Sequence, residues 1–202
     1  MNIKEISRTK EGRAGLLKLI SDKLVGAGMN WQGITTPEDI VREMVRCVPD
    51  VTSLKRILVL FNIEFLECLI KELGIDPSCV TMISDTKLEA MYAEKIYGVH
   101  SSVIVEHTLE GLKAATVGCE GYDVIFSNPP YQVEDGGHAA SARPIYHEIV
   151  MYAIDSLKPS YLCMITPSRW MAGGKGLNDY RARMLADKHI KTIVDFQATN
   201  EV

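Results

Sequence analysis

Short apolar runs alternate with helix-like segments along this chain, and that alternation restricts its fold more than any other feature. Strand-forming runs stand at 56–60, 80–84, 101–105, 122–127, 160–166 and 190–196. Segments with apolar residues at helical spacing lie between several of them, at 63–74, 86–98, 143–157 and 177–188. Strands that alternate with helices form βα units with parallel strands. We therefore expect a doubly wound α/β fold, with a mostly parallel sheet and helices on both faces.

The composition is that of a globular protein, since 47% of the 202 residues are hydrophobic and 24% are charged. No run approaches the ~18 apolar residues of a membrane span, and charges occupy the N-terminal stretch where a signal peptide needs an apolar core. We expect no membrane contact and a cytoplasmic location. The five cysteines include no C-x-x-C pair and the five histidines have no ligand-like spacing, so no metal site is predicted.

The chain divides near residue 35. Residues 1–34 contain an amphipathic helix at 12–28, whereas 35–202 hold the whole alternating pattern. We therefore expect an N-terminal helical segment followed by one domain. That domain opens with a clear helix start, in which Thr36 is the expected N-cap and Pro37 the first helical residue.

The fourth apolar run leads directly into Asn128, Pro129, Pro130 and Tyr131, at the strand end where open parallel sheets bind ligands. Prolines force the residues before them into extended backbone and donate no N–H, so this arm offers carbonyl oxygens, an amide and an aromatic ring. Convergent acceptors and a flat ring suit a planar ligand with an exocyclic amine. Holding both amine hydrogens would favour a localised nitrogen lone pair. A rigid turn without a chemical role is the alternative, because Asn-Pro is a common turn dipeptide.

Three stretches resemble one class of enzyme. "YDVIFSNPPYQ" is similar to the catalytic motif of amino-group methyltransferases that use S-adenosylmethionine. "TPEDIVREMV" resembles the Thr-Pro helix that precedes the catalytic domain in adenine-N6 DNA methyltransferases, and "PIYHEIVMYAIDSLKPSYLCMITPSRWMAGGKGL" resembles the stretch after the motif in restriction–modification and phage methylases. The resemblance covers 35–202, and its motif order is that of the group called gamma. It implies a Rossmann-like methyltransferase domain.

The resemblance also implies roles for single residues. Asn128 and the Pro129 carbonyl would accept from the target amine, and Tyr131 would stack on a base flipped out of the duplex. Thr36 and Pro37 would lie near the methionine part of S-adenosylmethionine. The residues expected to approach the substrate are Pro130, Arg169 and Trp170, although Trp170 fits a core position equally well.

The residues expected to bind the cofactor match the family's pattern less closely. The family's first strand ends in an acid and a glycine turn, D-x-x-x-G-x-G, whereas Val59 stands near the acid's place and no glycine follows until Gly74. A different loop supported by Asn62 or Glu64 would then hold the cofactor, unless Glu64 only suits the first turn of a helix. The other two candidates are Asp85, for the ribose hydroxyls or as part of a helix cap with Thr86 and Glu89, and Glu106, for the adenine.

The net charge of −4 counts against duplex binding by this chain alone. We expect contacts to double-stranded DNA mostly through parts absent from the chain, which stops before the family's last strand and target-recognition domain, and a possible restriction endonuclease partner. Cytosine-N4, RNA and protein glutamine are alternative targets. A silent binding module without cofactor is the alternative that the missing glycine turn favours.

Overall fold

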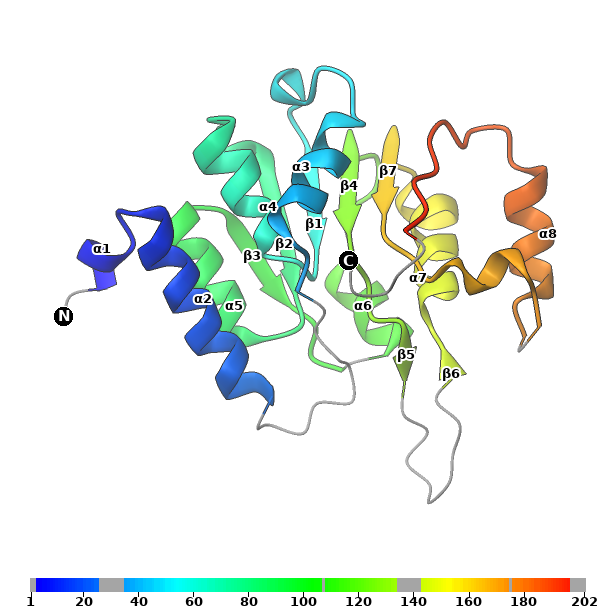
Figure 1. Ribbon diagram of the computed structural model, residues 1–202, viewed down its shortest axis with the longest axis horizontal. Coiled ribbons are helices and arrows are strands. Elements are labelled where there is room, and N and C mark those ends of the chain that lie inside the picture. The colour runs from blue at the N-terminus through cyan, green and yellow to red at the C-terminus, as the bar shows by residue number, and fades with distance from the viewer. Residues whose placement is uncertain (1–2, 26–34, 107, 134–142, 175, 197–202) are drawn as a thin grey trace.

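The computed structural model describes residues 3–25, 35–106, 108–133, 143–174 and 176–196. Its centre is a parallel five-stranded sheet in the order β3-β2-β1-β4-β7 (Figure 1). The strands are β1 (Ile57–Leu60), β2 (Val80–Ser84), β3 (His100–Val103), β4 (Val124–Ser127) and β7 (Tyr161–Met164). A small antiparallel pair, β5 (Gln132–Val133) and β6 (Arg143–Pro144), follows β4 in the chain.

Helices cover both faces of the sheet, as the alternating pattern predicts (Figure 1). The α-helices are α1 (Ile3–Ile6), α2 (Lys10–Val25), α3 (Glu38–Arg46), α4 (Glu64–Leu66), α5 (Lys87–Tyr92), α6 (Leu109–Ala115), α7 (Tyr146–Tyr152) and α8 (Asn178–Ala186). Three of them continue as π-helical segments, at Glu67–Glu72, Ala93–Tyr97 and Ala153–Leu157. Short 3₁₀ turns occupy Val51–Ser53, Pro77–Cys79 and Ser168–Met171.

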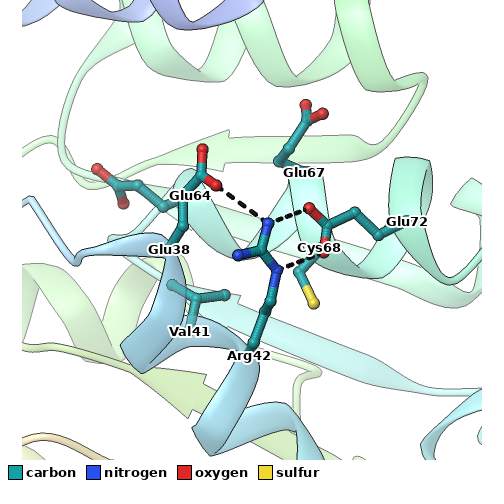
Figure 2. Close-up of a pocket in the computed structure, with 7 residues that line it drawn as sticks. All are labelled: Glu38, Val41, Arg42, Glu64, Glu67, Cys68 and Glu72. Atoms are coloured by element: carbon teal, nitrogen blue, oxygen red, sulfur yellow. Dashed lines mark hydrogen bonds and ion pairs between the residues drawn. The ribbon is translucent and has the colours of Figure 1, made fainter. Parts of the chain in front are cut away.

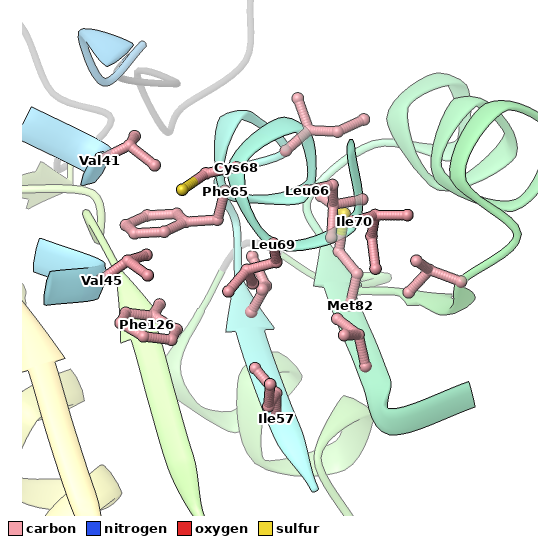
Figure 3. Close-up of a cluster of buried hydrophobic side chains, with 14 of the residues drawn as sticks. Val41, Val45, Ile57, Phe65, Leu66, Cys68, Leu69, Ile70, Met82 and Phe126 are labelled. Atoms are coloured by element: carbon pink, nitrogen blue, oxygen red, sulfur yellow. The ribbon is translucent and has the colours of Figure 1, made fainter. Parts of the chain in front are cut away.

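Alternate residues of each strand point to opposite faces, and the core is divided accordingly. On one face, Ile57 and Val59 pack with α3, α4 and the π-helical segment after it. Phe65 stacks on Phe126 there, with ring centroids 5.2 Å apart, and both rings are fully buried (Figure 3). On the other face, Leu58 packs with α6, α7 and the π-helical segment after α7.

The strand order reverses between β1 and β4. From β1 the chain adds β2 and β3 on one side, and it then crosses to place β4 on the other side. Loops after the two central strands therefore leave from adjacent positions at the carboxyl edge, where doubly wound sheets bind ligands. The Ser127 hydroxyl donates to the Leu60 carbonyl at 3.0 Å and ties these two strand ends together.

The N-terminal helix α2 is joined to the sheet domain by a half-buried ion pair. The Arg13 guanidinium donates two bonds to the Glu67 carboxylate, at 2.6 and 2.8 Å, and the Tyr97 hydroxyl donates a third at 2.9 Å. Burial alone raises the pKa of Glu67, but Arg13 and Tyr97 lower it on balance. The Tyr92 hydroxyl also donates to the Arg13 carbonyl. The helix in 1–34 thus packs directly on the domain that begins at 35.

Three sequence-based expectations need correction. Residues 190–196 form no strand, because they pair with no neighbour and leave Ile193 and Val194 more than half exposed. The helix α6 was not expected, although Thr108 caps it by accepting from the Gly111 N–H. The N-cap of α3 is Pro37 rather than Thr36, since the Pro37 carbonyl accepts the first helical bond, from Val41.

No helix in the described part of the chain is both long and apolar enough to cross a membrane. This finding accords with the absence of any long apolar run in the sequence.

Candidate active site

Asn128 follows β4 directly and is held by hydrogen bonds from two of its polar atoms. Its backbone N–H donates to the Asn62 side-chain oxygen at 2.5 Å, and its side-chain amide nitrogen donates to the Thr36 hydroxyl at 3.2 Å. Its side-chain oxygen is buried and has no hydrogen-bond partner among the described residues. Buried polar atoms are nearly always bonded, so this oxygen is an acceptor prepared for a donor that the described residues do not supply.

Thr36, Asn62 and Asn128 come together from three distant parts of the sequence. Thr36 precedes α3, Asn62 follows β1, and all three residues are at most 3% exposed. The two prolines after Asn128 are buried as well. The carboxyl edge therefore brings the Thr-Pro helix start, the first strand's loop and the Asn-Pro-Pro-Tyr arm into one site.

Tyr131 ends the arm at the border of an aromatic cluster. Its ring meets the edge of Tyr146 with centroids 6.5 Å apart, and Tyr146 packs in turn against Tyr180. Burial raises the pKa of Tyr131, and the Asn128 amide partly lowers it, which places the tyrosine hydroxyl beside that amide. The ring is thus supported from behind while it stays partly exposed.

Three carboxylic acids gather beyond the ends of β1 and β2. Burial raises the pKa of Glu64 to about 7, and Asp85 adds to the rise, while N–H groups of Glu64 itself and of Thr36 lower it. Burial likewise raises the pKa of Glu89, which shares a hydrogen bond with Asp85. Glu89 also accepts from the Ser84 and Thr86 hydroxyls, at 3.0 and 3.1 Å. Glu64 and Glu89, at this edge of the sheet, therefore hold their protons more tightly than ordinary carboxyl groups.

Comparison with known families decides what this arrangement belongs to. The model of the Eco57I restriction-modification methylase family matches residues 65–202, which include β4, the Asn-Pro-Pro-Tyr arm and everything after them. The chain belongs to this family. The resemblance seen in the motifs is thereby confirmed, as is the Rossmann-like α/β fold.

One curated relative supports the same methylase assignment. A protein of Mycoplasma pneumoniae described as an uncharacterized adenine-specific methylase is 38% identical over 79 residues. That match covers 38% of this chain and 18% of the relative. The matched stretch thus spans less than a fifth of the relative's length.

The expected substrate residues of this methylase chain are separated by the structure. Trp170 is buried in the aromatic cluster, with its ring 5.7 Å from Tyr180, so it occupies a core position. Arg169 is exposed and close enough to Tyr146 to counteract the rise in the pKa of that phenol caused by burial. Arg169 thus lies near Tyr146, the ring that Tyr131 contacts, whereas Trp170 supports the cluster from within.

The expected cofactor residues of the methylase lie along the carboxyl edge in chain order. Pro37 caps α3, and Asp85 follows β2 directly. The capping arrangement expected at Thr86 is present, because its hydroxyl accepts from the Glu89 N–H. Glu106 follows β3 and is exposed. Its carbonyl lies so close to Gly111 that a Cβ there would approach within 1.9 Å, so the loop's position depends on that glycine.

Phe61 stands where the family's glycine turn would begin, and the sequence pattern gave no sign of its conformation. Its φ of 73° is in the left-handed region, which costs a bulky residue free energy and is glycine's usual role. The side chain is buried among Leu58, Leu60 and Ile83. The backbone thus makes a glycine-like turn after β1, although the residue is phenylalanine. Strained residues of this kind cluster at functional sites.

A small crevice lies between α3 and the helical segment after β1 (Figure 2). It is lined by Glu38, Val41, Arg42, Glu64, Glu67, Cys68 and Glu72, and it encloses at most about 170 Å³. Arg42 bridges it by bonds to Glu72 and Glu38. Ligand pockets usually have about 300–1,000 Å³, so this ion-paired crevice is no nucleoside pocket. Among the described residues, no group of three or more His, Cys, Asp or Glu could hold a metal ion.

Replacing Glu64 by glutamine is expected to stabilise the protein at pH 8 and to change little at pH 4. The folded pKa of about 7 exceeds the ordinary value of 4.5, so the folded state binds an extra proton between these values and loses stability as pH rises through them. Glutamine removes this loss, worth about 1–2 kcal/mol for a half-buried group. Urea unfolding at both pH values measures it, with Glu94→Gln on an exposed residue as control. An equal effect of Glu64→Gln at both pH values would contradict the prediction.

Proposed function

We propose that this chain is the catalytic part of a DNA adenine-N6 methyltransferase that acts on a flipped adenine with S-adenosylmethionine. The observation that carries the proposal is the Asn128 side-chain oxygen, a buried acceptor without a partner among the described residues. It heads the Asn-Pro-Pro-Tyr arm in a chain of a methylase family. A primary amine on a planar base supplies the donors that such an arm lacks.

The residues of the arm act by position and polarity. The Asn128 oxygen and the Pro129 carbonyl accept the two amine hydrogens, which concentrates the nitrogen lone pair and directs it away from the arm. The Tyr131 ring stacks on the base, a contact worth about 1–3 kcal/mol. S-Adenosylmethionine, when bound, supplies the electrophilic methyl group.

The carboxyl edge fits that cofactor in its hydrogen-bonding groups. Glu64, Asp85 and Glu89 gather there, and S-adenosylmethionine carries an ammonium and two ribose hydroxyls to which carboxyl groups can bond. Asp85 follows β2, the position of a ribose-binding acid, and the backbone turn at Phe61 replaces the glycine turn. Pro37, Asn62 and Glu106 complete the set of residues proposed to surround it, and the backbone of Thr36 lies beside them while its hydroxyl bonds to Asn128.

Duplex DNA is the proposed partner, although the charge of this chain does not favour it. The net charge is −4, whereas duplex affinity depends on Lys and Arg. Because the match covers 18% of the relative, most DNA contacts are assigned to parts outside this chain. A cytoplasmic location and an accompanying restriction endonuclease belong to the same proposal.

A silent methyltransferase-fold module is the second candidate, and Phe61 favours it. A phenylalanine in place of the glycine turn brings a side chain to the strand end where cofactor backbone contacts are made. This candidate predicts no binding of S-adenosylmethionine, so calorimetric titration of the protein with the cofactor separates the two.

Transfer of labelled methyl groups tests the leading proposal. The full-length protein is incubated with labelled S-adenosylmethionine and unmethylated duplex DNA, and the modified nucleosides are identified by mass spectrometry. N6-methyladenine is the expected product. N4-methylcytosine, or label only in RNA or in protein glutamine, would replace the adenine assignment with one of these targets.

A further inference from the structure

The Asn128 side chain can serve as an acceptor only in one of its two amide orientations. A half-turn about its last bond exchanges the oxygen, which accepts, with the nitrogen, which donates. If the nitrogen stood in the oxygen's place, its hydrogens would repel the hydrogens of a target amine and no hydrogen bond could form. Something in the protein must therefore fix the orientation before the base arrives.

One oxygen lies on the nitrogen side of this amide. The Thr36 hydroxyl accepts from the Asn128 nitrogen at 3.2 Å, in a bond between buried atoms. The Tyr131 hydroxyl is also near the amide, which offsets part of the rise that burial causes in the pKa of Tyr131. On the other side, the Asn128 oxygen is left buried and open to a donor. The Asn62 oxygen holds only the backbone N–H, so it fixes the residue's position but not the amide's orientation.

Thr36 is itself held rigidly. It is 1% exposed, and the following proline restricts its backbone to extended conformations. Its N–H lies close enough to the Glu64 carboxyl group to lower the pKa of that group. The hydroxyl of a threonine before a helix usually accepts a hydrogen bond from an N–H at the helix N-terminus, but α3 has no such side-chain cap. The hydroxyl is thus free of that role and available to Asn128.

We propose that Thr36 is a positioning residue for the transfer reaction, whose hydroxyl holds the Asn128 amide with its oxygen toward the target amine. This role differs from contact with the cofactor and rests on the proposed function. The Thr-Pro helix start is then one of the segments that help to bind the target amine. A change at Thr36 then affects the chemical step even when cofactor binding is intact.

Nuclear magnetic resonance tests the orientation without any activity. In full-length protein labelled at asparagine, the Asn128 side-chain amide protons are expected to show nuclear Overhauser contacts to Thr36 protons. Their exchange with water should be slower than that of the exposed Asn178 amide and about tenfold faster in Thr36→Val than in Thr36→Ser. Absence of the contacts in the wild type, with the assigned amide visible, would overturn the proposal whether or not the protein is an enzyme.

Steady-state kinetics then tests the consequence. Thr36→Val, which replaces the hydroxyl by a methyl group, is expected to lower kcat about 10- to 100-fold and to leave the KM for S-adenosylmethionine within about threefold, while Thr36→Ser keeps kcat within about threefold. A purely structural or cofactor-binding role would raise KM or fail to be rescued by serine, and either result rejects the proposal. Should Thr36→Val not fold, Thr36→Ala is measured against Thr36→Ser in its place. If the wild type transfers no methyl group, the proposed function fails, and the resonance experiment alone decides the orientation.

Discussion

Replacing Asn128 with alanine is expected to lower the rate of methyl transfer by at least about 100-fold, the loss typical when one preorganised polar contact to the reacting group is removed. The change deletes the unpaired buried acceptor and leaves the acidic edge that would hold the cofactor untouched. Affinity for S-adenosylmethionine, measured by calorimetry, should therefore stay within about threefold of the wild type. Retained transfer in Asn128→Ala would show that the arm does not hold the target amine.

The same substitution should cost little or no stability. A buried acceptor without a partner is itself unfavourable by about 1–3 kcal/mol, and the bond to Thr36 that is lost is worth about 1 kcal/mol. Activity lost without a matching loss in the free energy of unfolding is the signature of a residue kept for function. Asn178→Ala, at an exposed asparagine of α8, is the matched control. Its activity should be near wild type, and its stability should fall by no more than about 1 kcal/mol, because it loses only the exposed bond from the Gly174 N–H.

Replacing Arg13 with alanine is expected to lower the free energy of unfolding by about 3–5 kcal/mol, because it leaves the Glu67 carboxylate without its cation. The two side chains are only 10% and 14% exposed, and the pair joins α2 to the segment after β1. Urea unfolding of Arg13→Ala and wild type at neutral pH measures the effect. A loss of that size would make the 1–34 segment an integral part of the domain rather than a separable one.

An exposed ion pair of similar geometry provides the control. Arg183 donates two bonds to Asp155, at 2.5 and 3.0 Å, but both side chains are nearly half exposed. Arg183→Ala should therefore cost less than about 1 kcal/mol. If Arg13→Ala costs no more than this, α2 contributes little to the stability of the domain.

The centre of the sheet could be predicted from the sequence because β1, β2 and β4 are buried on both faces and have nearly continuous apolar runs. Five of the six expected strands are present within a few residues of their expected ends. The sixth run, 190–196, has the same composition but stays unpaired. A strand requires a neighbour as well as a suitable composition, and the composition of a segment carries no information about its neighbour.

The parts of the site that depend on residue type could be predicted from the sequence. The parts that depend on how side chains and backbone are oriented could not. The Asn-Pro-Pro-Tyr arm follows from prolines that fix the backbone and an asparagine that only a ligand explains. The pairing of Thr36 with Asn128 could not be read from sequence, because a threonine before a proline looks like a helix cap. The left-handed backbone at Phe61 was equally hidden, since phenylalanine does not signal that conformation.

The three anchors of the Asn128 site come from parts of the chain that are far apart. Asn128 lies 66 residues from Asn62 and 92 residues from Thr36. Contacts over such distances require large loops to close and form slowly in a folding chain. The contacts among these three residues therefore cannot form within a short stretch of chain, since no single βα unit contains two of the residues. Its assembly needs the sheet and the start of α3 together, and a shorter piece of the chain that lacks any one of these segments would have no complete site.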